Sequence, residues 1–396
     1  MEHKYKLSIC MMVKDEEKNI QRCLDSLVHL IDDGFGELII IDTGSKDRTI
    51  EIAKQYTSNI YYHKWNNDFS YMRNKSIYYA KGEWIFIIDA DERLDSPLEL
   101  KDLIKNGRLD KYNSASFKVK SLSSMDEERQ YSYLVSPRIF RNDGSLRYEG
   151  VIHNQPIFKS PTLNLNMSIT HWGYMTSDKQ LMDKKFNRTA TALLSELNKD
   201  PENLYYGYQL GASYDIHGDN KEALNQLRKV YGMLNKKDVE EKKKHIYIYG
   251  AYAIVARTGS KFKEALDVCK EGIKLRYDYV DLYYIAASCC DSMGNEEEAF
   301  KYYLRYIELS NKYSDLEISK DLAIIQYNMD IVSKSNAYFY ISQYYLNKDR
   351  YDEAYKTCKL IDDKSKKTYL MIKILIKLKN YDELIDYYNK IDDEKI

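Results

Sequence analysis

The most informative segment of the chain reads Glu83-Trp84-Ile85-Phe86-Ile87-Ile88-Asp89-Ala90-Asp91-Glu92-Arg93. Its five unbroken apolar residues, 84–88, predict a strand buried on both faces, in a sheet covered by helices on both sides. Ligands bind beyond the carboxyl ends of such strands, where Asp89 and Asp91 lie. Two carboxylates there suit Mg²⁺ or Mn²⁺ holding phosphates. A lone Asp-x-Asp is more often a solvated turn that caps a helix, so the neighbouring segments have to decide.

Length and composition narrow the classes of protein to consider. The 396 residues suffice for two or three domains, and the 60 basic and 61 acidic side chains nearly balance. This balance argues against a nucleic-acid binder that relies on bulk charge. No apolar stretch is long enough to span a bilayer, and the first residues show no signal-peptide pattern, so we expect a cytoplasmic protein. The six cysteines lie mostly in apolar periodic segments, which predicts buried thiols.

Strand and helix patterns alternate through the first 93 residues. This order predicts an α/β fold with a mostly parallel sheet. The expected strands span residues 7–13, 37–41, 60–63 and 84–88, and the expected helices 16–31, 49–56 and 71–80. From Ser114 the alternating pattern predicts antiparallel strands around a polar hairpin at 121–130, with further extended segments at 147–158 and 163–171. We therefore expect one domain over residues 1–177.

Residues 178–396 have a helical character and an internal repeat. One frame runs Gly211-x-x-Tyr214-x-x-x-Gly218-x-x-x-x-Ala223, and it recurs as Ala287-x-x-Cys290-x-x-x-Gly294-x-x-x-x-Ala299. Small residues at these positions let two antiparallel helices approach closely, and the pattern resembles tetratricopeptide repeats. Unrelated helical hairpins are the alternative. In both cases the helix pairs would stack into a solenoid with a face for a peptide or partner.

Three predicted strands end in polar residues at the same edge of the sheet. Residues 12–15 follow the first strand, Asp42 the second, and Asp89 and Asp91 the strand at 84–88. One carboxylate could accept hydrogen bonds from a base or ribose, and the paired ones could hold a metal that bridges a diphosphate. Neither Gly-x-Gly-x-x-Gly nor Gly-x-x-x-x-Gly-Lys-Ser/Thr is present. The layout thus predicts a nucleotide-diphosphate site without a dinucleotide or P-loop motif.

Four motifs in order resemble glycosyltransferase family 2. They are Ser8-Ile9-Cys10-Met11-Met12-Val13-Lys14-Asp15-Glu16-Glu17-Lys18-Asn19-Ile20, Ile41-Asp42-Thr43-Gly44-Ser45-Lys46-Asp47-Arg48-Thr49, Asn67-Asp68-Phe69-Ser70-Tyr71-Met72-Arg73-Asn74 and Asp89-Ala90-Asp91-Glu92. The resemblance implies a GT-A fold, inversion at the anomeric carbon, and a nucleotide-sugar donor with Mg²⁺ or Mn²⁺. A subgroup of the family adds C-terminal tetratricopeptide-like repeats. Within it, residues 64–75 and 83–85 look like the peptide S-glycosyltransferases that modify glycosylated bacteriocins.

The resemblance implies a role for each matching position. Asp91 would be the main metal ligand, Asp89 would contact ribose or metal, and Asp42 would contact the uracil or ribose of a UDP-sugar. Family members often have Asn at the position of Asp15, so the base-binding wall is less defined. The full set expected to bind the nucleotide-sugar is Met12, Val13, Asp15, Asp42, Asp68, Arg73, Asn74, Asp89, Ala90, Asp91 and Arg141.

The segment after residue 113 should carry the acceptor chemistry. Glu149 is a candidate base, and His153 could be a base, a metal ligand or a diphosphate contact. His171 is a second candidate for the tasks of His153, and Arg141 could clamp the diphosphate or form a surface ion pair. A cysteine thiol as acceptor would need a base less than a hydroxyl would.

Three functions stay open at this point. The first is transfer of a glucose- or GlcNAc-type sugar from a UDP-sugar to a Cys, Ser or Thr side chain of a peptide or protein held by the repeats. The second replaces the peptide by a glycan or lipid-linked acceptor in cell-envelope synthesis. The third is a catalytically inert adaptor, which the paired acids Asp89 and Asp91 argue against. A homodimer is compatible with each.

Overall fold

The structure is a computed structural model that describes residues 3–122, 130–173, 179–322 and 324–393. The chain divides into two compact units. The first comprises Met1–Met125, Tyr133–Ser213 and Lys320–Ile325, and the second Asp126–Ser132, Tyr214–Ser319 and Gln326–Ile396. The expected domain boundary at 177/178 lies outside the described residues. Helix α6 (Lys179–Lys199) and the first part of α7 (Leu204–His217) group with the sheet in the first unit.

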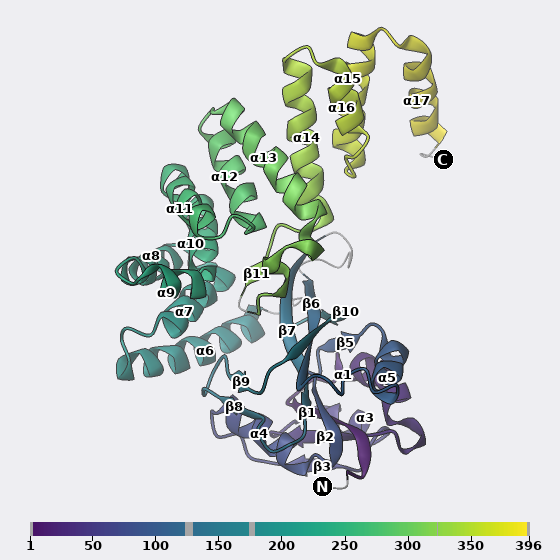
Figure 1. The fold of residues 1–396 in the computed structure, drawn as a ribbon, viewed down its shortest axis with the longest axis vertical. Coiled ribbons are helices and arrows are strands. Elements are labelled where there is room, and N and C mark those ends of the chain that lie inside the picture. Colours follow the sequence, from purple (N-terminus) through teal and green to yellow (C-terminus); the bar gives the residue numbers. More distant parts are fainter. Residues whose placement is uncertain (1–2, 123–129, 174–178, 323, 394–396) are drawn as a thin grey trace. The chain divides into compact units, whose positions relative to one another are not determined.

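A mixed sheet forms the centre of the first unit (Figure 1). Its strands follow the order β3-β2-β1-β4-β7-β6-β10-β5, and β11 pairs with β7. Strands β3, β2, β1 and β4 are parallel, which confirms the α/β prediction. Strand β7 runs antiparallel to β4 and lies beside β6, whereas β6 pairs parallel with β10, so this part of the sheet is mixed. The strands are β1 (Tyr5–Val13), β2 (Gly36–Asp42), β3 (Ile60–Tyr62), β4 (Gly82–Ile87), β5 (Glu92–Leu94), β6 (Ser114–Leu122), β7 (Tyr131–Arg141) and β10 (Thr162–His171).

Strand β4 explains why the segment 84–88 is apolar without a break. Trp84, Phe86 and Ile88 belong to the core on one face of the sheet, and Ile85 and Ile87 to the core on the other. All five are at most 1% exposed. Because successive side chains of a strand point to opposite faces, a strand covered on both faces needs apolar residues at every position.

Short helices cover the two faces of the sheet. The predicted helix at 16–31 is broken into α1 (Ile20–Asp25) and α2 (Val28–Ile31), followed by a 3-10 turn, η1 (Asp32–Gly34). The others are α3 (Thr49–Ala53), α4 (Phe69–Tyr79) and α5 (Pro97–Lys105). The extended segment expected at 147–158 forms a separate two-stranded sheet, β8 (Arg147–Glu149) and β9 (Gln155–Ile157). Most of the hairpin expected at 121–130 lies outside the described residues.

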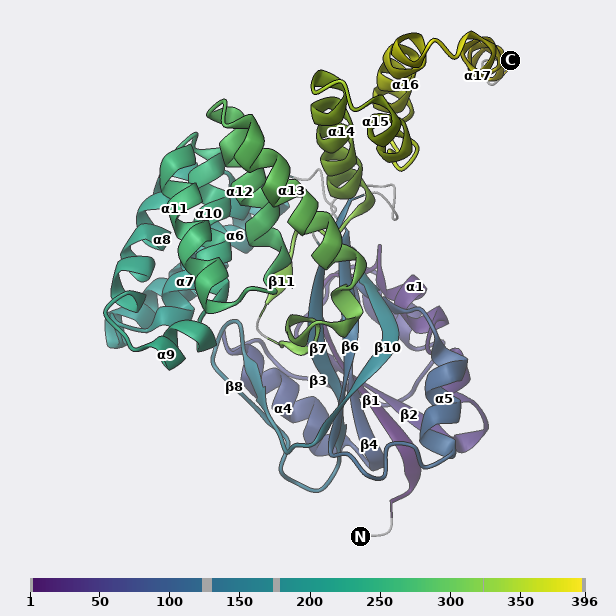
Figure 2. The same ribbon diagram turned by 45° about the horizontal axis from the view of Figure 1, so that its top comes forward.

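The second unit consists of helical hairpins (Figures 1 and 2). Left-handed residues follow the first helix of successive hairpins at Gly218, Ser260, Gly294, Asp349 and Lys379, so the repeat frame seen in the sequence sets the turns. The helices are α8 (Asn220–Leu234), α9 (Val239–Lys244), α10 (Tyr247–Thr258), α11 (Phe262–Leu275), α12 (Val280–Ser292), α13 (Glu296–Asn311), α14 (Ile331–Asn347), α15 (Tyr351–Cys358), α16 (Lys364–Leu378) and α17 (Tyr381–Asp393), with the short η2 (Tyr313–Asp315), η3 (Glu317–Lys320) and β11 (Ile325–Gln326).

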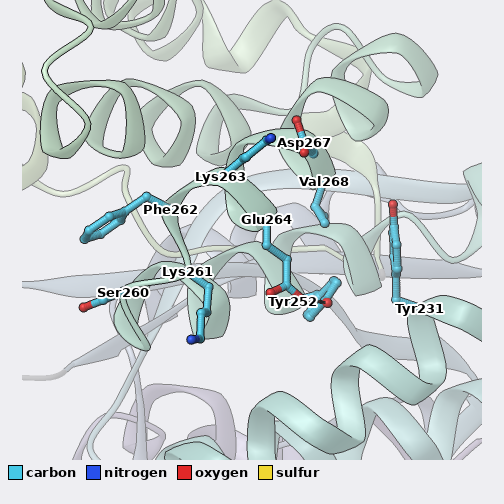
Figure 3. A pocket seen from close by; sticks show the side chains of 9 residues that line it. All are labelled: Tyr231, Tyr252, Ser260, Lys261, Phe262, Lys263, Glu264, Asp267 and Val268. Carbon is cyan, nitrogen blue, oxygen red and sulfur yellow. Dashed lines mark hydrogen bonds between the residues drawn. The ribbon is translucent and has the colours of Figure 1, made fainter.

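Two further properties of the chain follow from its side chains. The six cysteines are buried and free, as predicted. Among the described helices, none combines the length and the apolar character that a membrane crossing requires. A cavity of about 540 Å³ opens in the second unit, where Tyr231 of α8, Tyr252 of α10 and Phe262 of α11 line it together with charged residues of α11 (Figure 3).

Candidate active site

Polar residues follow β1 and β2 at the carboxyl edge of the sheet. Val13 is the register partner of Asp42, so the ends of these strands lie side by side. Asp42 is 5% exposed and its Oδ1 accepts a hydrogen bond from the Ser45 amide at 3.0 Å. Asp15 has a left-handed backbone (φ 54°), and its Oδ1 accepts from the Lys46 amide at 2.7 Å. Asp15 therefore braces the loop after β2, beside Val13 and the half-buried Met12.

Helix α4 carries three of the predicted nucleotide-sugar residues, and each has a defined partner. Asp68 is the N-cap of α4: its Oδ1 accepts from the Tyr71 amide at 2.9 Å. The side-chain amide of Asn74 donates to the Tyr148 carbonyl at 2.9 Å and accepts from the Tyr148 amide at 2.8 Å. Only Arg73 extends to the aspartates. Asp68 and Asn74 thus fix α4 and β8, which hold Arg73 in place.

Asp89 is the centre of a buried ionic network. Arg73 Nη2 donates to both of its carboxylate oxygens, at 2.9 and 3.0 Å, and Arg138 Nη1 lies 3.9 Å away. Arg138 Nη2 also donates to Glu92 Oε1 at 2.6 Å. Burial favours the neutral acid, but Arg73 and Arg138 outweigh it and hold the pKa of Asp89 below its ordinary value. Asp89 therefore stays ionised between two arginines.

Asp91 faces His171 across the site. Asp91 Oδ2 lies 3.4 Å from His171 Nε2, and the two side chains are only 18% and 19% exposed. His171 ends β10, where its Nδ1 is 3.2 Å from Ser121 Oγ. Burial lowers the pKa of His171, but the carboxylates of Asp91, Glu92 and Asp89 reverse this and raise it above its ordinary value. The Asp91 carboxylate and the imidazole thus form a pair with a fixed orientation.

The pair Asp91–His171 fits a divalent cation better than Asp89 does. Mg²⁺ is usually held by one or two carboxylates together with substrate phosphates, and histidine is a common metal ligand in proteins. Among the described residues no group of three or more His, Cys, Asp or Glu side chains is close enough to hold a metal without such a substrate. Asp89 is already occupied by Arg73, whereas Asp91 and His171 present an oxygen and a nitrogen to the same space.

The structure places Arg141 away from this edge of the sheet. Arg141 is the register partner of Trp84, near the start of β4, and its Nη2 donates to the carbonyls of Asp110 and Tyr112 at 3.2 Å. Because β7 runs antiparallel to β4, the residues that precede Arg141 approach the carboxyl end of β4. The structure therefore does not bring Arg141 to the aspartates, and its Nη1 lies 3.8 Å from Glu83, as the ion-pair alternative expected. Arg138 is the arginine of β7 that reaches Asp89 and Glu92.

The two remaining candidates lie around the β8–β9 sheet. Glu149 pairs with Arg147 at 2.8 Å, and its side chain is 57% exposed, whereas Tyr148 between them is buried. The structure thus does not bring Glu149 to the aspartates. His153 is half-buried, and the burial of its imidazole lowers the pKa of that group to about 4. Its Nε2 has no hydrogen-bond partner in the part of the chain that the structure describes.

Several residues of the site escaped the sequence reasoning. Arg138 and Glu92 complete the network of Asp89, and neither was among the predicted site residues, although Glu92 belongs to the motif Asp89-Ala90-Asp91-Glu92. Glu16 is half-buried, and burial together with the charges of Asp91 and Asp89 raises its pKa, against a hydrogen bond from Asn19. Of these residues, only Glu16 could have been suspected from the sequence, because it is the acid that directly follows Asp15 at the end of the first strand. The role of Arg138 depends on the register of β7 and β4, which a single sequence does not give.

Gly173 is a further position that the site requires. A Cβ built on Gly173 would collide with both His171 Nε2 and Asp91 Oδ2. We expect Gly173→Ala to separate this pair and to lower UDP-sugar turnover about tenfold, the effect of losing about 1.4 kcal/mol of transition-state stabilisation. The turnover is measured as steady-state release of UDP. Gly232→Ala in α8, where a Cβ meets no atom within 4 Å, is the matched control. Equal turnover by both variants would contradict the prediction.

Comparison with known proteins agrees with this site. Residues 8–164 match the model of the glycosyl transferase family 2. The glycosyltransferase SunS of Bacillus subtilis is 32% identical over 225 residues, which cover 55% of this chain and 51% of SunS. A TPR repeat-containing protein of Synechococcus elongatus is 32% identical over 235 residues, 56% of this chain and 55% of that protein. The chain thus matches these relatives over about half of their length.

Solved structures share lower similarity with the chain. S. aureus TarS 1–349 in complex with UDP is 17% identical, with 78% of this chain and 91% of that one aligned at a TM-score of 0.34. YrrB, a TPR protein with a peptide-binding site, is 13% identical over 48% of this chain and 87% of its own, at 0.35. The sheet and its motifs agree with one reading: residues 8–164 match the model of glycosyltransferase family 2, and the helical hairpins that follow resemble tetratricopeptide repeats.

Proposed function

We propose that the chain is an inverting glycosyltransferase that moves a glucose- or GlcNAc-type sugar from a UDP-sugar to a cysteine side chain of a peptide or protein. The observation that carries the proposal is the Arg73–Asp89 and Asp91–His171 arrangement at the carboxyl end of β4, within a family 2 domain. An inert adaptor would not need a buried ionic network at this edge. SunS, a relative that matches 55% of this chain, is named a glycosyltransferase, which supports the reaction class.

The side chains of the site suit binding of a nucleotide-sugar. Asp42, fixed by the Ser45 amide, presents a carboxylate where β2 ends and can accept hydrogen bonds from the base or ribose. Arg73 and Arg138 hold Asp89 rigid, so it needs little reorganisation when the donor binds. Asp91 and His171 would hold Mg²⁺ or Mn²⁺, which, when bound, supplies positive charge to the departing diphosphate.

The state of the candidate bases favours a thiol as the acceptor. A hydroxyl acceptor needs a base near neutral pKa, but burial lowers the pKa of His153 to about 4, so its imidazole accepts a proton poorly. Glu149 is exposed and paired with Arg147. A cysteine thiol is a few per cent ionised at neutral pH and strongly nucleophilic, so it can attack without a strong base. The cavity lined by Tyr231, Tyr252 and Phe262 in the helical unit offers aromatic and charged walls to a peptide segment.

A transfer assay tests this proposal. Purified protein with Mn²⁺ and UDP-glucose or UDP-GlcNAc is incubated with two peptides that differ only by Cys or Ser at one position. We expect release of UDP and, by mass spectrometry, a hexose or N-acetylhexosamine on the Cys peptide at least tenfold faster than on the Ser peptide. If sugar is transferred only to a glycan or lipid-linked acceptor, the proposed peptide acceptor is wrong and that class of acceptor takes its place. If the protein neither releases UDP nor binds the donor in calorimetry, the result supports the inert adaptor.

A further inference from the structure

The loop between β8 and β9, residues 150–154, has an unusual backbone. Gly150 has φ 95°, and His153 has φ 47° although it carries a side chain. The left-handed conformation is unfavourable for an L-residue, and such residues concentrate at ligand-binding sites, where surrounding contacts hold them. The contacts of this loop therefore indicate what its conformation serves.

Helix α7 supplies the contacts that hold His153. The Tyr205 hydroxyl donates to the His153 carbonyl at 3.1 Å and accepts from Gln155 Nε2 at 2.6 Å. Gln155 Nε2 also donates to the His153 carbonyl, at 3.2 Å. On the other side, the Phe69 amide donates to the Val151 carbonyl at 3.0 Å, so α4 fixes the same loop. All five residues belong to the first compact unit.

Two side chains of this loop, in contrast, carry polar atoms that form no hydrogen bond with the described residues. His153 Nε2 and the neighbouring Asn154 Nδ2 are buried, and no hydrogen bond reaches either atom from the residues that the structure describes. A buried polar atom without a partner is destabilising, so both atoms indicate a ligand that supplies oxygens. Burial keeps the His153 imidazole neutral near pH 7 because its pKa is about 4, and a neutral imidazole can donate one hydrogen bond.

We propose that Tyr205 is a positioning residue that fixes the strained His153 so that its Nε2 binds a diphosphate oxygen of the nucleotide-sugar. This inference rests on the proposed donor, and it goes further because it assigns a task at the donor site to a tyrosine that follows the sequence-matched domain (8–164) by about 40 residues. Tyr205 does not touch the donor. It acts through the His153 carbonyl, and Gln155 shares this task.

Binding of UDP to the full chain tests the proposal, with Tyr205→Phe as the main variant. Tyr206→Phe is the matched control, because Tyr206 is the next residue of α7 and its hydroxyl would lie 3.1 Å from a Cβ built on Gly150 of the same loop. His153→Asn removes the imidazole but keeps a residue type that tolerates a left-handed backbone. The dissociation constant of UDP is measured by calorimetry for each variant and for Tyr205→Phe combined with His153→Asn. Thermal unfolding reports any general loss of stability.

We expect Tyr205→Phe to weaken UDP binding three- to tenfold relative to Tyr206→Phe at a similar Tm, which corresponds to one ordinary hydrogen bond. In the His153→Asn background the same change should have no further effect, because Tyr205 acts through the imidazole. Equal UDP affinity in Tyr205→Phe and Tyr206→Phe, an undiminished effect in the double variant, or no UDP binding by the unmodified chain would overturn the proposal. If Tyr205→Phe weakens UDP binding as expected but neither the unmodified chain nor any variant transfers sugar, only the proposed function is overturned.

Discussion

Asp91→Asn should lower the kcat of UDP-sugar turnover at least 100-fold and leave the fold intact. Asparagine has the shape of aspartate, so the packing around His171 and Gly173 is kept, but the negative charge is lost. With it goes the strongest oxygen ligand that this edge of the sheet offers to a divalent cation, beside a diphosphate that must depart. A 100-fold loss corresponds to about 2.7 kcal/mol, within the several kcal/mol that a metal contributes to charge stabilisation.

The measurement is UDP release as a function of Mn²⁺ concentration, together with thermal unfolding. Asp143→Asn is the matched control, since Asp143 is an acid that pairs with Lys159 in the turn after β7. This control should retain the turnover of the unmodified chain, and excess EDTA should lower the turnover of the unmodified chain to that of Asp91→Asn. Turnover by Asp91→Asn within threefold of the control would exclude Asp91 as a metal ligand.

The part of the site that the sequence predicted is the part that local patterns encode. The unbroken apolar run in β4 reports two covered faces, and the aspartates that follow it must lie at the carboxyl edge. Asp42 follows from the same argument for β2. For these positions, the residue type and its place at the end of a strand are sufficient to predict that the side chain belongs to the site. No pairing between distant segments has to be known.

The part that the sequence did not predict depends on pairing between distant segments. Arg138 and Arg141 are three residues apart on β7, and only the register with β4 decides which of them meets Asp89. The partners of Asn74 and His153 depend in the same way on where β8 and α7 dock. The periodicity of apolar residues predicted that α6 is a helix. It did not predict that α6 groups with the sheet, because the sequence of a helix does not show which part of the protein packs against it.

Arg138→Met should be the most destabilising single change at this site. Arg138 binds Glu92, a carboxylate only 3% exposed, and removing one partner of a buried ion pair leaves the other charge uncompensated. The expected cost is about 3 kcal/mol of the free energy of unfolding, at the lower end of the range for broken buried pairs. Turnover should fall as well, because Asp89 loses its second arginine.

The pH dependence of the loss gives a sharper test. Burial already raises the pKa of Glu92 above its ordinary value against the opposing charge of Arg138, and without Arg138 it rises further. A carboxyl whose folded pKa exceeds its unfolded pKa is stabilising at low pH, and this stability is lost as pH rises through the folded pKa. The deficit of Arg138→Met, measured by urea unfolding, should therefore be largest above neutral pH and shrink toward pH 5.

Arg141→Met separates this network from the assignment that the sequence suggested. Arg141 caps the carbonyls of Asp110 and Tyr112 and lies over the Trp84 ring, 4.4 Å from its centroid, so its loss should cost about 1 kcal/mol of stability. Because it lies near the start of β4, UDP release should stay near that of the unmodified chain. The opposite pattern, with turnover lost in Arg141→Met and kept in Arg138→Met, would mean that the diphosphate binds at the other end of β4. The partly buried carboxylate of Asp89 and the buried carboxylate of Glu92 would then need a purely structural explanation.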